Sequence, residues 1–240
     1  MFTMLNRMCW NSRGWRLPTG TSEDGGYPSK MGFGHEEWNF QIEDAVDGFV
    51  YGYLYYNPAE KVIRESGGNF RIGFWSIHPD TREKLLVGMY NGATQPTDDD
   101  YKKVDKVFLQ SKIYERRIEE LLVAVSSISE KTAHDEVTNS VKQRWLNFKC
   151  PIEQVQHLTE YVPVTDIVID KPLGQYFTRP TFIPQGNLPE MPRRLPHQTE
   201  RTITPQRSTT LAEDAYYRET SKNLRRIIRY HNKLSNKFAG

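Results

Sequence analysis

The pattern of apolar residues changes at Asp98, and this change limits the folds that the chain can form. Before it, runs of aromatic and aliphatic residues bounded by Gly, Pro or Asn predict strands over 3–9, 48–56, 70–78 and 84–90. After it, apolar residues recur at three- and four-residue intervals, which predicts helix over 98–129. We therefore expect an α+β fold with a mostly β N-terminal half.

Strand 70–78 carries apolar residues at successive positions. Alternation places Phe74 on one face of the sheet and Trp75 on the other, so we expect both faces to be covered. Thr97 and Asp98 are natural N-cap residues for the helix that follows. The expected domain closes with a strand over 141–150 and a short helix or turn over 153–158.

Prolines and charge divide the rest of the chain. Seven of the 14 prolines fall between Pro172 and Pro205, so we expect 1–170 to be the main domain and 171–210 a Pro-rich linker or wrapping arm. Residues 211–240 predict a basic amphipathic helix whose apolar stripe needs a partner surface. Residues 1–170 carry a net charge of −6, and the rest carries +8, so a polyanion would be attracted by the C-terminal third.

Composition excludes several classes of protein. The chain has no apolar run of transmembrane length and no signal-peptide pattern, so we expect a cytoplasmic protein without membrane contact. Its two cysteines, Cys9 and Cys150, have no partner at zinc spacing and are expected to be reduced thiols.

The segment Trp10-Asn-Ser-Arg-Gly-Trp15 places two indoles, an amide, a hydroxyl and a guanidinium on one loop after the first strand. Proteins that extrude a base stack it on aromatic side chains and bind its edge with polar groups. The alternative is that Trp10 and Trp15 belong to the core and donate their N–H groups to backbone carbonyls. The residue types alone do not decide between a binding loop and a core loop.

These residue types define a predicted pocket for a modified base. Its predicted members are Trp10, Asn11, Ser12, Trp15, Trp38, Tyr53 and Trp75, with Arg13, Arg16 and Lys30 expected on the flanking phosphates. Tyr53 shares a strand face with its tyrosine neighbours two positions away, so the alternative for this residue is simple sheet packing.

The segment His35-Glu-Glu-Trp-Asn39 suggests a metal site or an acid/base pair, but adjacent carboxylates point to different sides of a helix or strand. No second His follows at zinc-hydrolase spacing. Pro79-Asp80 with Glu83-Lys84 lacks the intervening strand of a metal-dependent nuclease site. We therefore predict no catalytic residues, no metal and no cofactor in this chain.

The first 95 residues resemble the N-terminal domains of bacterial restriction-endonuclease-like proteins, in which such a domain precedes an HNH or PD-(D/E)XK nuclease. The resemblance is carried by Trp10-Asn-Ser with Gly14-Trp15, Pro18-Thr-Gly20, Gly32-Phe-Gly-His-Glu-Glu-Trp-Asn-Phe40, 47–54 and Val87-Gly-Met-Tyr-Asn-Gly-Ala93. The arrangement is also similar to EVE, YTH and PUA-like folds, which are small curved β-barrels that bind a modified base in an aromatic pocket. The ending 229–238 is similar to the helix that opens the nuclease part of some of these proteins.

The resemblance implies a DNA-binding reader of a modified base that directs a modification-dependent restriction or phage-defence system. On that interpretation the nuclease domain or subunit lies outside this chain. The alternative is an assembly module that forms a homodimer through 211–238, or a nuclease subunit whose catalytic part lies elsewhere.

Overall fold

The computed structural model describes residues 2–20, 26–55, 68–164 and 181–183. All of them lie in Met1–Asn187, the first of two units into which the chain divides. The predicted helix over 211–240 and the predicted linker, apart from 181–183, lie outside the described residues. Those predictions, and the homodimer that depends on them, stay predictions.

The main sheet has five strands in the order β6-β4-β3-β1-β7. The strands are β1 (Phe2–Arg7), β3 (Phe70–Ile77), β4 (Lys84–Ala93), β6 (Val155–Pro163) and β7 (Thr181–Ile183). β1 and β3 are parallel, and the other neighbours are antiparallel. A second sheet pairs β2 (Phe49–Tyr53) with β5 (Leu146–Pro151). Because β4 is antiparallel to both β3 and β6, strands β1, β3 and β6 all point the same way.

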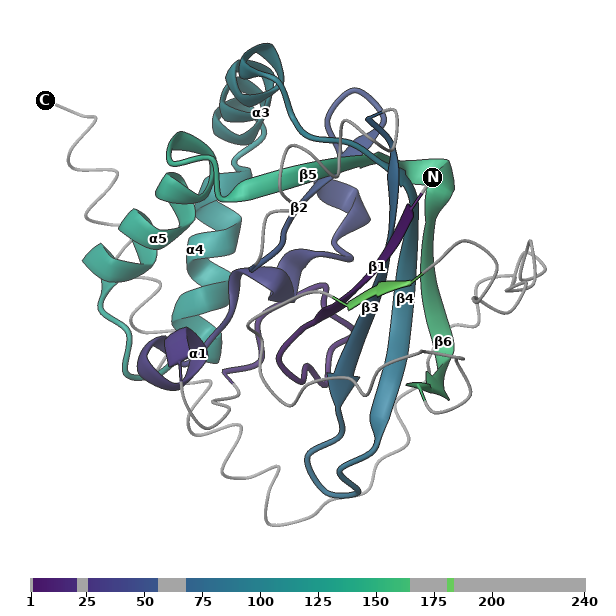
Figure 1. The fold of residues 1–240 in the computed structure, drawn as a ribbon. Helices are drawn as coiled ribbons and strands as arrows, with labels where there is room; N and C mark the ends of the chain where they lie inside the picture. Colours follow the sequence, from purple (N-terminus) through teal and green to yellow (C-terminus); the bar gives the residue numbers. More distant parts are fainter. Residues whose placement is uncertain (1, 21–25, 56–67, 165–180, 184–240) are drawn as a thin grey trace, which may run out of the picture. The chain divides into compact units, whose positions relative to one another are not determined.

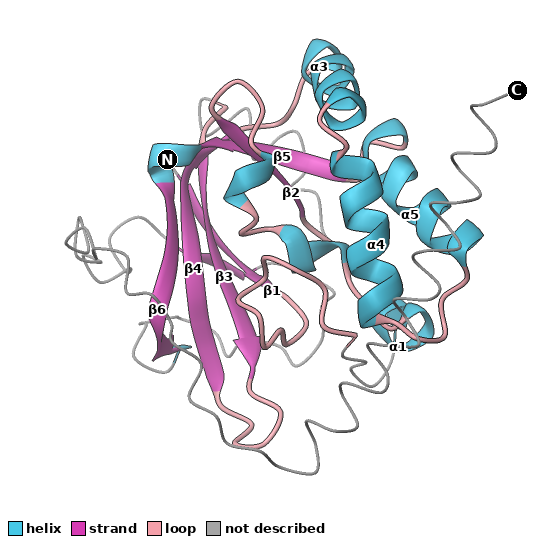
Figure 2. Cartoon of the chain, turned by 180° about the vertical axis from the view of Figure 1, so that it is seen from behind, coloured by secondary structure: helices cyan, strands magenta, loops and turns pink. Residues whose placement is uncertain are grey.

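The helices lie on one side of the main sheet, and the β2–β5 pair lies between (Figures 1 and 2). They are α3 (Asp98–Gln110), α4 (Ile113–Ala124) and α5 (Glu130–Lys142), with the short α1 (Gly26–Met31) near them. There are also three short 3-10 helices, η1 (His35–Trp38), η2 (Ile42–Asp44) and η3 (Ile152–Gln154), among the described residues. The predicted α+β class is confirmed. The described strands are not joined into a closed barrel, so the finer PUA-like or EVE-like description stays a prediction.

Several predicted boundaries were wrong. The helix predicted over 98–129 is two helices, because Lys112 adopts a left-handed conformation with φ 55° between them. The strand predicted from 141 begins at Leu146, since α5 continues to Lys142. The turn predicted over 153–158 is η3 followed by β6. The N-cap prediction is confirmed for Thr97, whose hydroxyl accepts the Asp100 N–H.

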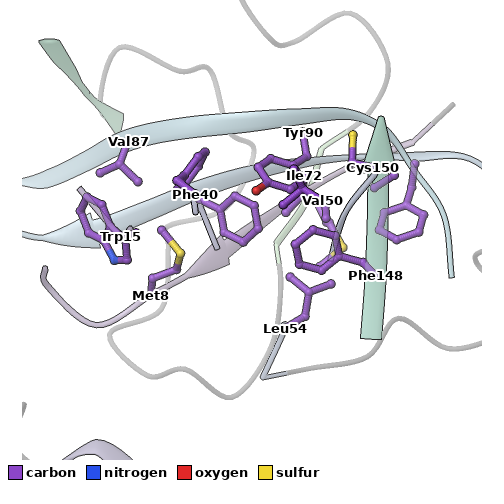
Figure 3. Packing of buried hydrophobic residues seen from close by; sticks show 14 residues of the cluster. Met8, Trp15, Phe40, Val50, Leu54, Ile72, Val87, Tyr90, Phe148 and Cys150 are labelled. Atoms are coloured by element: carbon purple, nitrogen blue, oxygen red, sulfur yellow. The ribbon is translucent and has the colours of Figure 1, made fainter. Parts of the chain in front are cut away.

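The core fills the space between the main sheet and the β2–β5 pair (Figure 3). Phe40, Phe74, Tyr90 and Phe148 meet edge to face or tilted, with ring centroids 5.1 to 5.9 Å apart. The backbone approaches closely where Gly88 lies, because a Cβ there would come within 2.4 Å of the Phe40 ring. Trp75, on the other face of β3, is also buried, so the prediction that both faces are covered is confirmed.

A buried ion pair joins the 3-10 turn η2 to helix α4. Arg117 Nε lies 2.7 Å from Asp44 Oδ2, and both side chains are 4 % exposed. The guanidinium also lies over the Trp38 and Phe108 rings. Removing the Asp44 carboxylate would leave the buried Arg117 without its ion-pair partner, which costs about 3 to 5 kcal/mol in such pairs. Asp44 itself also pairs with Arg116. No helix among the described residues is long and apolar enough to cross a membrane.

Candidate functional site

Three strand ends bring together aromatic side chains that are far apart in the sequence. Trp10 follows β1, His78 follows β3, and Tyr161 lies near the end of β6. The Trp10 ring centroid is 4.6 Å from that of His78 and 6.2 Å from that of Tyr161. Trp15 completes the group at 5.9 Å from Trp10 and 5.8 Å from Tyr161. We call these residues, Trp10, Trp15, His78 and Tyr161, the Trp10 cluster.

Asn11 fixes the loop that carries Trp10. Its side-chain oxygen accepts the backbone N–H groups of Arg13 (2.7 Å) and Trp15 (3.0 Å). Its amide nitrogen donates to Leu17 O and to Glu37 Oε2, both at 2.7 Å. These bonds use the full hydrogen-bonding capacity of the amide, and Asn11 is 1 % exposed. Asn11 therefore holds the loop and does not face a ligand.

Trp15 is the buried anchor of the same loop. Its side chain is fully buried, and its indole N–H donates to Cys9 O at 2.9 Å, as expected for a core tryptophan. Its φ of 53° is uncommon for a bulky residue, and the two bonds of Asn11 Oδ1 to this loop hold it there. The sequence left open whether the two tryptophans of this loop bind a ligand or belong to the core. Trp15 belongs to the core, whereas Trp10 is only half-buried.

Glu37 forms hydrogen bonds that fix the Trp10 loop. The fully buried carboxylate accepts hydrogen bonds from Asn11, from the backbone and hydroxyl of Thr19, and from Gly34 N. Burial raises the pKa of Glu37 to about 7, against the opposing effect of the bonds from Gly34 and Thr19. Its neighbour Glu36 instead accepts Cys9 N. Among the described residues, the two carboxylates thus form hydrogen bonds with different partners. This confirms the prediction that they do not converge.

The Trp10 cluster presents polar ring atoms at its edge. His78 Nδ1 accepts the backbone N–H groups of Asp80 (3.2 Å) and Thr81 (3.3 Å), so the ring proton lies on Nε2. Tyr161 is half-buried, and burial raises the pKa of its hydroxyl. Among the described residues, neither His78 Nε2 nor the Tyr161 hydroxyl has a hydrogen-bond partner.

The predicted phosphate-binding residues differ in position. Ser12, Arg13 and Arg16 are exposed on the Trp10 loop. Arg16 forms an ion pair with Glu43, and both side chains are about half exposed, at 47 % and 48 %. Such a surface pair contributes about 0 to 1 kcal/mol, so an incoming phosphate can replace it. Lys30 is exposed at the end of α1, and no contact among the described residues joins it to this loop.

The other predicted pocket residues lie apart from the Trp10 loop. Trp38 is 4 % exposed and donates to Glu120 Oε2 at 2.8 Å. Trp75 lies on the opposite face of β3 from the core. Its ring centroid is 6.0 Å from Arg7 Cζ and 5.9 Å from Lys84 Nζ. Tyr53 contacts the His35 ring at 5.5 Å. The described contacts therefore do not bring these three residues together with Trp10.

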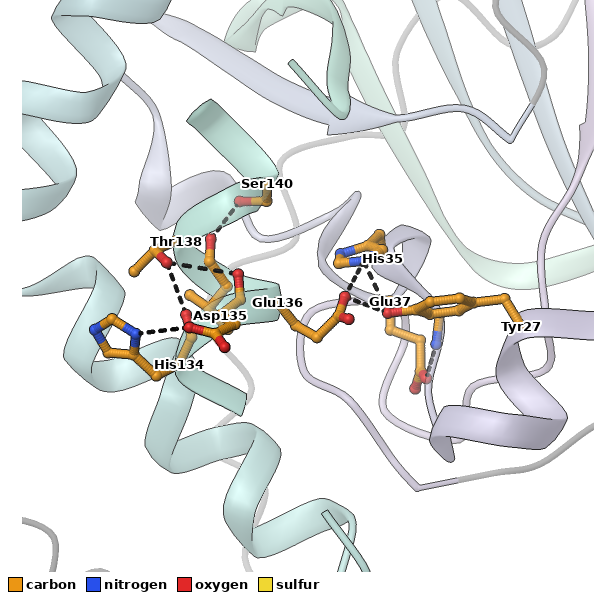
Figure 4. Close-up of polar contacts among 10 residues, drawn as sticks. Tyr27, His35, Glu37, His134, Asp135, Glu136, Thr138 and Ser140 are labelled. Atoms are coloured by element: carbon orange, nitrogen blue, oxygen red, sulfur yellow. Dashed lines mark hydrogen bonds and ion pairs between the residues drawn. The ribbon is translucent and has the colours of Figure 1, made fainter. Parts of the chain in front are cut away.

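A second group of residues surrounds His35, and Figure 4 shows its polar contacts with Tyr27 and Glu136. His35 Nε2 is 3.1 Å from both Glu136 Oε2 and the Tyr27 hydroxyl, which itself donates to Glu136. The rings of Phe33, Tyr53 and Trp145 lie 4.8 to 5.5 Å from the imidazole. Burial acts to raise the pKa of Glu136, but the bonds from His35 and Tyr27 leave this pKa below its usual value. We call Tyr27, Phe33, His35, Tyr53, Trp145 and Glu136 the His35 cluster.

Comparison of the chain with known proteins gives no match. No protein-family model, curated protein or solved structure matches the chain. Within the residues that the structure describes, no group of three His, Cys, Asp or Glu side chains is placed to hold a metal ion.

Sequence reasoning missed His78, Tyr161 and Glu136. The sequence held a weak signal for His78, because His78 stands at the end of the predicted strand 70–78 and Trp10 stands just after the predicted strand 3–9. Tyr161 gave none, since β6 was not predicted. Glu136 lies on the unpredicted helix α5 and is 101 residues from His35.

Proposed function

We propose that the chain binds DNA and reads a modified base on the Trp10 cluster, as the targeting part of a modification-dependent restriction or phage-defence system. The observation that carries this proposal is a half-buried Trp10, on a loop held rigid by Asn11, between aromatic residues from two other strand ends. Aromatic side chains stack on nucleobases, and each such contact contributes about 1 to 3 kcal/mol.

The ring spacing favours a platform over a closed cage. The four rings lie 4.6 to 6.2 Å apart with steep interplanar angles, so they contact one another directly. A base between two parallel rings needs about 7 Å between them, twice the usual stacking distance. The proposed base is therefore turned out of the duplex and stacks on one side of the cluster.

Charge beside the platform supports a nucleic-acid ligand. Arg13 and Arg16 are exposed on the same loop as Trp10, where phosphates flanking an extruded base would pass. Ser12 offers an exposed hydroxyl on this loop. The main domain has a net negative charge, so we expect these local cations, and not the overall charge of the domain, to position DNA.

The proposal keeps the PUA-like or EVE-like interpretation of the fold and assigns recognition, not cleavage, to this chain. A partner nuclease domain or subunit would cut the DNA. In such an arrangement the Trp10 cluster supplies selectivity for the modification, while the loop cations supply affinity that falls with salt concentration.

Affinity measurements with short DNA duplexes test the proposal. Duplexes carrying one 5-methylcytosine, 5-hydroxymethylcytosine, glucosylated hydroxymethylcytosine or N6-methyladenine are compared with an unmodified duplex by fluorescence anisotropy. We expect at least one modified duplex to bind more tightly, and Trp10→Ala to weaken that binding about 5- to 150-fold. Tyr55→Ala removes an aromatic side chain that is 55 % exposed elsewhere and should leave affinity unchanged. Equal affinity for all duplexes, unaffected by Trp10→Ala, would contradict the proposal.

A further inference from the structure

Two polar groups at the edge of the Trp10 cluster restrict which ligand can stack there. Backbone N–H groups of Asp80 and Thr81 occupy His78 Nδ1, so the neutral ring offers only the Nε2 proton. His78 therefore acts as a hydrogen-bond donor beside Trp10, at a ring-centroid distance of 4.6 Å. A ligand edge that also donates would leave this proton without a partner.

Tyr161 is placed beside the same indole by an irregularity in β6. The β4–β6 pairing moves from Gly88 opposite His157 to Leu86 opposite Val162, so β6 uses five steps where β4 uses two. Extra residues of this kind redirect side chains at a sheet edge. The Tyr161 ring meets both Trp10 and Trp15 edge to face, and its hydroxyl both donates and accepts hydrogen bonds.

Stacking on Trp10 would remove water from both groups. A half-buried donor that loses its water and gains no acceptor weakens binding, because the desolvation of the polar group is not compensated. A methyl substituent offers no acceptor, whereas a hydroxymethyl substituent offers an oxygen that accepts from His78 and exchanges a hydrogen bond with Tyr161.

We propose that His78 and Tyr161 determine specificity, and that they select a base whose modification carries an oxygen over one that carries a methyl group. This inference rests on the proposed function, since it requires a base on the Trp10 cluster. It assigns the discrimination to two residues outside the Trp10 loop, from β6 and from the residue after β3.

The test compares duplexes with one 5-hydroxymethylcytosine, one 5-methylcytosine or unmodified cytosine at the same position. Tyr161→Phe removes only the hydroxyl. His78→Asn retains an acceptor at the position of Nδ1 for the Asp80 and Thr81 N–H groups and removes the Nε2 donor. Tyr55→Phe is the matched control, because it removes the hydroxyl of a tyrosine that is 55 % exposed and does not belong to the Trp10 cluster. Thermal unfolding of each variant shows that it is folded.

We expect wild type to prefer the hydroxymethylated over the methylated duplex by about tenfold. Tyr161→Phe and His78→Asn should each reduce this preference at least several-fold, while Tyr55→Phe retains it. A wild-type preference for the methylated duplex would overturn the inference and leave base reading intact. So would a hydroxymethyl preference that Tyr161→Phe does not reduce, even if His78→Asn fails to fold. Equal binding of all three duplexes would overturn the inference. If the glucosylated and N6-methyladenine duplexes also bind no more tightly than the unmodified one, and Trp10→Ala changes nothing, the proposed function is overturned as well.

Discussion

The Trp10 and His35 clusters both gather aromatic rings around a histidine, yet they differ in what their polar atoms contact. In the His35 cluster, the imidazole Nε2 and the Tyr27 hydroxyl are both bonded to Glu136. In the Trp10 cluster, His78 uses Nδ1 to fix its own turn, and its Nε2 has no hydrogen-bond partner among the described residues. The same residue types thus form mutual hydrogen bonds in the His35 cluster, whereas in the Trp10 cluster a ring N–H has no hydrogen-bond partner among the described residues.

The two clusters also differ in what they connect. His35 is 8 % exposed and joins α1, η1, β2 and α5 through its ring and hydrogen-bond contacts. Trp10 and His78 are half-buried at the ends of strands. We therefore expect substitutions in the His35 cluster to reduce stability, and substitutions at the edge of the Trp10 cluster to reduce binding.

The largest expected effect follows from truncating His35. His35→Ala removes a packed ring and leaves Glu136 without the imidazole, so the free energy of unfolding should fall by about 3 kcal/mol. His134→Ala is the matched control on α5, since that side chain is 50 % exposed and should cost less than about 0.5 kcal/mol. Urea denaturation measures both. A loss for His35→Ala no larger than that of the control would break the distinction between the two clusters.

His157 gives the Trp10 side a dependence on pH. This residue stacks on Phe40 beneath Gly14, and burial, with a smaller effect of Arg16, lowers its pKa to about 4 from 6.5. The unfolded chain therefore binds a proton between pH 6.5 and 4 that the folded chain does not. Stability from this residue is complete above pH 6.5 and falls by about 3 kcal/mol as the pH decreases to 4.

The His157 contribution is isolated by comparing wild type with His157→Gln across this range of pH. The comparison is needed because Glu37, with its pKa raised to about 7 from 4.5, acts in the opposite direction. Stability from Glu37 is complete below pH 4.5 and is lost as the pH rises through 7. The difference in unfolding free energy between the two proteins should change with pH mainly between 4 and 6.5. A constant difference would show that His157 protonates equally in both states.

A smaller effect should follow from adding a methyl group to the Trp10 loop. Gly14 has φ 67°, and a Cβ there would lie 2.8 Å from His157 Cε1. We expect Gly14→Ala to cost about 2 kcal/mol, of which about 1 kcal/mol comes from the left-handed backbone. Gly48→Ala is the matched control, with φ 79° and no atom within 4 Å of its Cβ. Equal losses for the two variants would show that the loop does not depend on close contact with His157.

The strands of the main sheet before residue 95 could be predicted, because β1, β3 and β4 combine apolar runs with flanking Gly, Pro or Asn. Helix α5 was missed since only a narrow stripe, Ala133, Val137 and Val141, is apolar. β6 was missed because its polar residues and its irregular pairing hide the alternation of a strand.

The candidate site was predictable only in its local part. The loop with Trp10 and its buried anchors lies within a few residues, so residue types indicated it. The positions of Trp38, Tyr53 and Trp75 depend on which strand and helix each contacts, and no spacing in the sequence encodes that. Tyr161 and His78 reach Trp10 only through the parallel direction of β1, β3 and β6.

Base extrusion onto Trp10 is the central claim, and fluorescence of a duplex tests it most directly. A 2-aminopurine placed opposite the modified base of the tightest-binding duplex brightens when its partner leaves the helix, since its stacking is reduced. With saturating protein, we predict a clear increase for wild type and a much smaller one for Trp10→Ala, measured at concentrations that saturate each. Saturated wild-type complexes without any increase would contradict the account.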